Sequence, residues 1–308
     1  MDVISTRGLT KFYGKTRGVE DLTMCVPQGA VYGFLGPNGS GKTTTIRCLL
    51  GMLKPSAGTA EVLGAPVGLD GHAQRARIGY VAGEVRLYER ETGKWHFDLV
   101  SGLRGGRGIL ERELVERFDF DPTRRVKEMS KGNKQKLALI LALAHDPELL
   151  ILDEPTSGLD PLNQESIYEV IGERVAAGRT VFLSSHVLSE VERICDRVGI
   201  IRQGKLVAEE GVRDLLGKRM RHIKVDFADP TEPGFLADLP GVDGVQALSE
   251  AALFARLKGD VVDDVIKRLA TRRVLDVHID QTSLEDVFLE FYRGDEPTPD
   301  TAEGGEAL

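Results

Sequence analysis

The sequence is poor in cysteine and has no long apolar run. Its 308 residues include three cysteines, Cys25, Cys48 and Cys195, which are too few and too scattered for a disulfide framework or a zinc site. They are typical of a reducing, cytoplasmic environment. The longest apolar run, Leu137 to Ala144, is less than half the length that spans a bilayer, and no signal-peptide pattern opens the sequence. We therefore expect any role at a membrane to come through another chain.

Positive charge is also in short supply. The chain carries 40 Lys and Arg against 48 Asp and Glu, a net charge of −8 at pH 7. Nonspecific binding to nucleic acid needs a broad basic face, so we expect no nucleic-acid partner. The sequence has no internal repeat, and the length is typical of about two globular domains.

What the sequence does contain is a glycine-rich loop between a strand-like run and a helix-like run. Residues 36–43 read GPNGSGKT and fit the pattern G-x-x-x-x-G-K-[ST]. Residues 30–35 predict a short buried strand, and residues 44–50 predict the helix that follows. Glycines let backbone N–H groups converge on phosphate oxygens, and the helix N-terminus adds partial positive charge. The pattern predicts a nucleotide-binding protein, and the strand and helix around it argue against a plain glycine turn.

Individual residues of this loop have predicted roles. Lys42 would reach the β- and γ-phosphates, and the Thr43 hydroxyl would ligate Mg²⁺. We expect no other metal, and because no second phosphate loop occurs, the chain carries one nucleotide cassette. The predicted nucleotide-binding residues in and beside the loop are Gly36, Pro37, Asn38, Gly39, Ser40, Gly41, Lys42, Thr43 and Thr44.

The order of apolar and polar segments predicts two domains and a tail. Short strands alternate with helices over residues 1–219, which indicates an α/β sheet domain, and residues 84–145 read as a helical subdomain inserted into it. Residues 220–293 predict a small α+β domain, with strands near residues 223–227, 253–257 and 274–279 and helices near residues 260–270 and 283–292. Residues 294–308 are acidic and rich in Pro and Gly, and we expect them to be disordered.

A second constellation follows the apolar run of residues 149–152. That run would deliver Asp153 to the end of a strand, where an Asp holds Mg²⁺ in nucleoside triphosphatases with this loop. The next residue, Glu154, is the candidate general base for the attacking water. Two surface acids at a strand end are the competing interpretation, which Lys42 and Thr43 make the weaker one.

Three motifs around this strand resemble those of a known family. They are DEPTSGLDP at residues 153–161, SKGNKQ at residues 130–135 and SSH at residues 184–186. Together with the phosphate loop, over about residues 3–211, they resemble the nucleotide-binding subunit of an ATP-binding cassette (ABC) transporter. The resemblance implies a P-loop nucleoside triphosphatase fold with a helical subdomain, ATP and Mg²⁺ as cofactors, and ATP hydrolysis.

The resemblance also implies roles for residues outside the loop. Tyr13 matches the aromatic residue that stacks on adenine, although a core position is equally open for it. His186 matches the histidine that contacts the γ-phosphate and the attacking water, and it joins Lys42 and Glu154 as a catalytic residue. Ser130 and Gly132 match the signature that serves the ATP of an opposite subunit, which implies a head-to-tail homodimer. Asp160 matches a loop that crosses between the subunits, where its role is positional.

The sequence departs from the family pattern at two places. Lys131 and Asn133 replace a glycine and a glutamine of the signature, and Lys131 either adds charge near the γ-phosphate or points to solvent. Gly83 stands where the family has a glutamine that contacts Mg²⁺ and water. Glu84, one residue on, is a weak candidate to replace it.

The variant signature and the residues 283–289 are similar to the drug and antibiotic exporter branch that includes daunorubicin-resistance pumps. The similarity implies a separate polytopic permease and a position on the cytoplasmic face of the membrane. Import in place of export stays open. Two competing hypotheses are an ABC protein of ribosomes or DNA repair, which generally has two cassettes or long coiled coils, and a non-hydrolytic ATP-gated scaffold.

Overall fold

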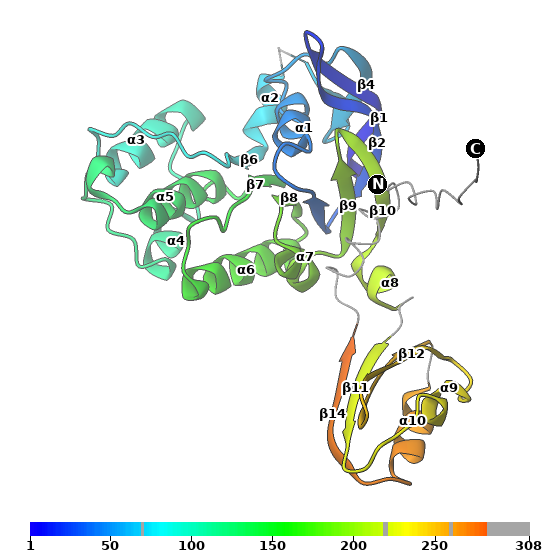
Figure 1. Cartoon of the computed structure of the whole chain (residues 1–308). Coiled ribbons are helices and arrows are strands. Elements are labelled where there is room, and N and C mark those ends of the chain that lie inside the picture. Colours follow the sequence, from blue (N-terminus) through cyan, green and yellow to red (C-terminus); the bar gives the residue numbers. More distant parts are fainter. Residues whose placement is uncertain (69–70, 218–220, 259–260, 282–308) are drawn as a thin grey trace, which may run out of the picture. The chain divides into compact units, whose positions relative to one another are not determined.

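The computed structural model describes residues 1–68, 71–217, 221–258 and 261–281 (Figure 1). The chain divides into two compact units, residues 1–212 and 213–308. The domain boundary predicted after residue 219 lies a few residues beyond this division and stays a prediction. The predicted helix at residues 283–292 and the predicted tail at residues 294–308 lie outside the described residues.

The first unit contains a six-stranded sheet with the strand order β10-β9-β3-β8-β7-β6. Its strands are parallel except β10, which pairs antiparallel with β9. The interior strands are buried along their whole length and mostly apolar, as expected of a parallel sheet with both faces covered, and the strands predicted near residues 30–35 and 149–152 are confirmed as β3 and β7. The strands are β3 (Val31–Leu35), β6 (Ile78–Val81), β7 (Leu149–Asp153), β8 (Thr180–Ser185), β9 (Arg197–Arg202) and β10 (Lys205–Gly211).

A second sheet in this unit is antiparallel, with the order β2-β1-β4-β5. One core joins it to α1 and to the six-stranded sheet, and Ile4, Met24, Phe34, Ile46 and Phe182 are fully or almost fully buried there. The two sheets therefore enclose the helix that follows the phosphate loop. The elements are β1 (Asp2–Tyr13), β2 (Thr16–Pro27), β4 (Ala57–Val62), β5 (Ala65–Pro66) and α1 (Lys42–Leu49).

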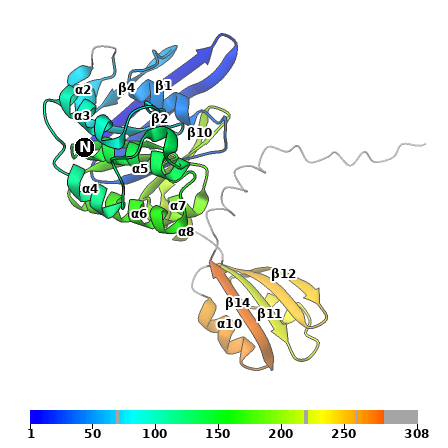
Figure 2. The same ribbon diagram turned by 90° about the vertical axis from the view of Figure 1, so that its left-hand side faces the viewer.

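Helices make up the rest of the first unit. The predicted helical insertion is confirmed, since α3, α4, η1 and α5 follow one another and gather on the β6 side of the sheet (Figures 1 and 2). Within the described ranges, no helix has both the length and the apolar composition needed to cross a membrane. The helices are α2 (His72–Ala76), α3 (Gly93–Arg104), α4 (Glu111–Arg117), η1 (Val126–Glu128), α5 (Lys131–Leu143), α6 (Pro161–Ala176) and α7 (Leu188–Ile194), with α8 (Val212–Gly217) at the division.

The second unit is α+β, as predicted. Its antiparallel sheet has the order β12-β13-β11-β14, and both of its described helices cover one face (Figure 1). The core between them includes Ile223, Val225, Leu253, Val265 and Leu269. The elements are β11 (Arg221–Phe227), α9 (Gly234–Ala237), β12 (Val242–Ser249), β13 (Ala252–Leu257), α10 (Val262–Leu269) and β14 (Val274–Gln281).

Candidate nucleotide-binding site

The carboxyl ends of three neighbouring strands bring the predicted site residues together. In the register of the sheet, Asp153 of β7 pairs with Ser184 of β8, and Leu35 of β3 pairs with Ser185. The residues that follow, Gly36, Glu154 and His186, therefore leave the same edge of the sheet. In open α/β sheets this edge is where ligands bind.

The loop from Gly36 to Thr43 depends on glycine at two positions. Gly41 has φ +111°, and a Cβ there would lie 2.5 Å from the carbonyl oxygen of Gly18. A Cβ on Gly36 would lie 2.4 Å from the carbonyl oxygen of Ile201. Helix α1 starts directly after Gly41 without a side-chain cap. Its first backbone N–H groups are thus directed at the space above the loop, which suits an anion.

Two buried polar side chains of the loop suit a phosphate. The Lys42 side chain is 5% exposed, and its ammonium group donates to the carbonyl oxygens of Gly36 at 2.6 Å and Pro37 at 3.2 Å. The Ser40 hydroxyl is buried and has no hydrogen-bond partner among the described residues. Both groups can donate to phosphate oxygens, so the loop fits a nucleoside triphosphate.

The carboxylate of Asp153 receives two hydroxyl groups. Thr43 Oγ1 donates to Asp153 Oδ2 at 2.8 Å, and the Ser184 hydroxyl donates to Oδ1. No cluster of three His, Cys, Asp or Glu side chains that could hold a metal occurs in the described ranges. An all-oxygen pair such as Thr43 and Asp153, completed by phosphate and water, is the donor set that Mg²⁺ prefers. Ser184 was not predicted to contact Asp153; this contact follows from the pairing of β8 with β7.

Glu154 lies between a lysine and a histidine. Its backbone is in the left-handed region, with φ +51°, and its N–H donates to the carbonyl oxygen of Ser184 at 3.0 Å. One carboxylate oxygen lies 3.4 Å from Lys42 Nζ, and the other lies 3.1 Å from His186 Nδ1. This backbone geometry directs the carboxylate toward the phosphate loop.

A cavity of about 260 Å³ lies above the phosphate loop. Tyr13, at the end of β1, is 45% exposed, and its hydroxyl lies 3.4 Å from Thr44 Oγ1. The ring of Tyr13 is therefore accessible beside the loop. The hairpin that follows Tyr13 was not predicted to belong to the site. The lining residues are Tyr13, Thr16, Arg17, Gly18, Asn38, Gly39, Gly41, Lys42, Thr43, Thr44 and Glu154.

Ser130, Gly132 and Asp160 are not among the residues that line this cavity. Ser130 is the N-cap of α5 and accepts a hydrogen bond from the Asn133 N–H at 3.2 Å. Asp160 is the N-cap of α6 and accepts from the Asn163 N–H at 3.0 Å, which holds the pKa of Asp160 below its ordinary value. One copy of the chain thus assembles the loop with Asp153, Glu154 and His186, and does not add the signature to that cavity.

The lysine that departs from the family signature lies along the loop after Glu154. Lys131 Nζ is 3.3 Å from the Ser157 hydroxyl, and a Cβ on Gly158 would lie 2.8 Å from Lys131 Cδ. The same loop is held by the Gln135 amide, which donates to the carbonyl oxygen of Pro155 at 2.8 Å. Helix α5 therefore contacts the segment that links Glu154 to Asp160.

The second departure lies against the carboxylate of Asp153. A Cβ on Gly83 would lie 3.4 Å from Oδ2 of Asp153, so position 83 faces Asp153. Glu84 instead forms an exposed ion pair with Arg86 at 2.9 Å. In this structure Glu84 does not take the place of the family glutamine.

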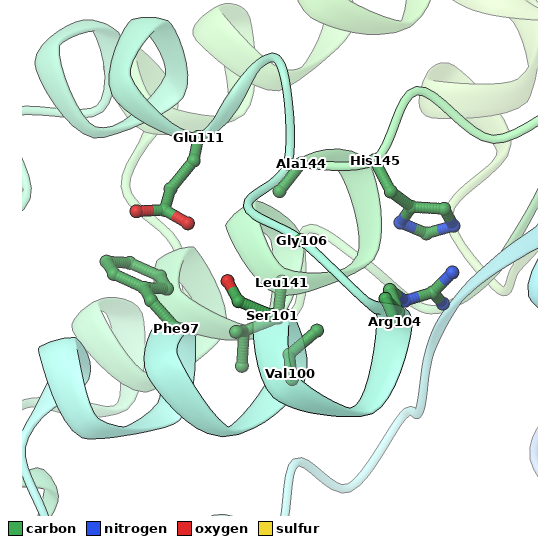
Figure 3. A pocket seen from close by; sticks show the side chains of 10 residues that line it. Phe97, Val100, Ser101, Arg104, Gly106, Glu111, Leu141, Ala144 and His145 are labelled. Carbon is green, nitrogen blue, oxygen red and sulfur yellow. The ribbon is translucent and has the colours of Figure 1, made fainter.

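A separate groove of about 830 Å³ lies where the helical insertion meets β6. Its lining combines exposed apolar side chains, Met52 and Leu103, with the basic side chains of Arg75 and Arg104. Figure 3 shows a smaller pocket next to this groove, where His145, just after α5, lies beside Arg104 of α3; both residues also line the groove. Burial, with a contribution from the Arg104 charge, lowers the pKa of His145 to about 4.

Comparison with known sequences agrees with the geometry. Residues 19–157 match the pattern described as ABC transporter. The chain is 40% identical to an uncharacterised ABC transporter ATP-binding protein of Nostoc sp., over 70% of this chain and 69% of that one. The bacitracin transport ATP-binding protein BcrA of Bacillus licheniformis is 38% identical over 74% of this chain and 76% of its own. The daunorubicin/doxorubicin resistance ATP-binding protein DrrA of Streptomyces peucetius is 34% identical over 93% and 91%.

Comparison with solved structures gives the same assignment. An ATP-binding subunit of an ABC transporter superposes with a TM-score of 0.65 at 29% identity, over 69% of this chain and 91% of that one. Sequence and fold agree along most of the length of these relatives. The chain belongs to the ATP-binding proteins of ABC transporters, and it is an ATPase of that family.

Proposed function

We propose that this ATPase is the motor subunit of an exporter that moves drugs, antibiotics or lipophilic compounds through a separate membrane permease. The observation that carries the ATPase role is the position of Glu154 between Lys42 and His186, beside the Thr43–Asp153 pair. The relatives named for bacitracin transport and for daunorubicin resistance support the class of cargo.

The residues of the site divide the work of hydrolysis among them. Tyr13 stacks on the adenine, and the loop N–H groups with Lys42 hold the β- and γ-phosphates. Thr43 and Asp153 would hold Mg²⁺, which supplies positive charge to the phosphate oxygens. Glu154 accepts a proton from the attacking water, and His186 orients the water and the γ-phosphate.

A second copy of the chain completes the site. The Ser130 hydroxyl and the Gly132 N–H lie at the start of α5, where the helix N-terminus favours a γ-phosphate. We assign them to the ATP of a head-to-tail partner, as the family resemblance implies, with Asp160 in the loop that crosses between the copies. Closure around ATP and reopening after hydrolysis would drive the permease.

The groove between the helical insertion and β6 is the proposed docking place for the permease. Its apolar rim and basic side chains suit a short amphipathic segment that carries a carboxylate. That contact would hold the chain on the cytoplasmic face of the membrane.

The substitution Glu154→Gln tests the ATPase role. We expect ATP binding to persist, turnover to fall by at least about a hundredfold because the proton acceptor is lost, and dimers to accumulate with ATP. Phosphate release, binding of a fluorescent ATP analogue and gel filtration measure the three effects. Glu84→Gln, at an exposed ion pair, is the control. Undiminished turnover of Glu154→Gln would refute the role of Glu154 as the proton acceptor.

A further inference from the structure

Glu190 is a buried carboxylate to which the mechanism above gives no role. It lies in the first turn of α7, and only 3% of its surface is exposed. Burial raises its pKa above the ordinary value. A carboxylate in such a place costs free energy unless its oxygens receive hydrogen bonds.

The two oxygens of Glu190 are shared between two catalytic loops. Oε1 accepts from the Thr156 hydroxyl at 3.0 Å, and Oε2 accepts from the Ser185 hydroxyl at 2.6 Å. Thr156 comes two residues after Glu154, and Ser185 comes directly before His186. Thr156, Glu190 and Ser185 thus form a hydrogen-bonded bridge between the two segments, and all three side chains are buried.

Helix α7, which carries Glu190, packs closely against strand β3. A Cβ on Gly33 of β3 would lie 2.9 Å from both Val191 Cγ1 and Cys195 Sγ, so only glycine allows α7 to pack this closely. The strand β3 leads directly into the phosphate loop. A carboxylate on α7 is therefore held in place relative to the phosphate loop as well as to the two loops it bridges.

An aromatic side chain lies beside the Glu190 carboxylate. It belongs to Tyr168, and burial, together with the Glu190 charge, raises the pKa of Tyr168 to about 12. Arg193 covers the Tyr168 ring at 5.1 Å and pairs with Glu165. Arg193, Tyr168 and Glu165 therefore lie on this side of Glu190 and the Thr156 hydroxyl.

We propose that Glu190 is a positioning residue for ATP hydrolysis, which joins the loop of Glu154 to the loop of His186 and so maintains their 3.1 Å contact. The inference rests on the proposed function. Glu190 acts through the hydroxyl groups of Thr156 and Ser185 and does not touch the nucleotide.

The test compares Glu190→Ala with Glu190→Gln. The alanine removes both acceptors, and we expect kcat to fall about tenfold or more while the KM for ATP stays within about twofold. The glutamine still offers an oxygen to one hydroxyl and an N–H to the other, and we expect it to restore most of kcat. Glu192→Ala, at an exposed glutamate of the same helix, is the matched control.

A double-mutant cycle with Thr156→Val separates positioning from general loss of structure. We expect Thr156→Val to lower kcat severalfold in the wild type and to have no further effect in Glu190→Ala, because both break one bridge. If Glu190→Ala fails to fold, Thr156→Val and Ser185→Ala carry the test, with melting temperature measured on each.

Two results would overturn the inference: a folded Glu190→Ala with unchanged kcat, or independent effects of Glu190→Ala and Thr156→Val. Measuring Glu154→Gln in the same assay distinguishes failure of this inference from failure of the proposed function. Loss of turnover in Glu154→Gln with full turnover in Glu190→Ala refutes the bridge alone, whereas full turnover in Glu154→Gln refutes the proposed role of Glu154 as proton acceptor.

Discussion

Among single residues, His145 is held uncharged by the fold at neutral pH. Its pKa is lowered from 6.5 to about 4, first by burial and then by the Arg104 charge. Between these two values the unfolded chain binds a proton that the folded chain does not. The contribution of His145 to stability is therefore complete above pH 6.5, falls as the pH drops toward 4, and does not change further below that.

We expect this single group to reduce the free energy of unfolding by about 2 kcal/mol between pH 7 and pH 5. Urea denaturation of the wild type and of His145→Leu at both pH values measures it, because the variant should lack this part of the pH dependence. His72→Leu, at an exposed histidine of the same unit, is the control. Equal pH dependence of the wild type and His145→Leu would contradict the expectation.

The residues of the candidate site were predictable where a short sequence motif contains them. They were not predictable where strand pairing or helix packing brings them to the site. Lys42, Thr43, Asp153 and Glu154 stand in short patterns whose chemistry is specific. Ser184 and the hairpin after Tyr13 lie at the candidate site, and Glu190 contacts the loop after Glu154, because of strand register and helix packing, which no local pattern encodes. Glu190 in particular looks like one more charge on a short helix.

Among the helices, α5 begins at a residue with two roles: Ser130 caps the helix and is proposed to bind the γ-phosphate of a partner's ATP. The Ser130 hydroxyl caps the helix through the Asn133 N–H. We expect Ser130→Ala to cost about 1 kcal/mol of stability and to lose ATP turnover. Ser130→Asn keeps a capping group but places an amide where the γ-phosphate would lie, so it should keep stability and lose turnover. Denaturation and phosphate release measure both, and full turnover in Ser130→Asn would leave Ser130 with the capping role alone.

Some strands were not predicted from the sequence, and the structure shows why. Register shifts along β1, such as the one between Thr6 and Leu9, break the alternation that marks a strand. Strand β12 is exposed along most of its length, so it lacks an apolar face. The strands of the parallel sheet were predictable because they are short, apolar and buried on both sides.

For the whole molecule, the groove proposed to bind the permease has a lining distinct from that of the cavity above the phosphate loop. Leu103 lines this groove on α3 and is 78% exposed. We expect Leu103→Glu to reduce the fraction of the chain that sediments with the membranes of the cell that makes it, because it puts a charge into an apolar contact. Val207→Glu, on β10 at the opposite edge of the sheet, is the control, and melting temperatures check folding. Unchanged sedimentation of Leu103→Glu would exclude this face as the attachment site.

The pairing of Asp153 with Ser184 and of Leu35 with Ser185 has a consequence for how this protein tolerates sequence change. A slip of one residue would turn every side chain of a strand to the opposite face, so the ladder has one acceptable alignment. The relative placement of Gly36, Glu154 and His186 is thus specified by main-chain hydrogen bonds, which every residue except proline can make. Much of the surrounding sequence is therefore free to diverge, which agrees with the 34% and 38% identity to relatives named for different compounds, daunorubicin/doxorubicin and bacitracin.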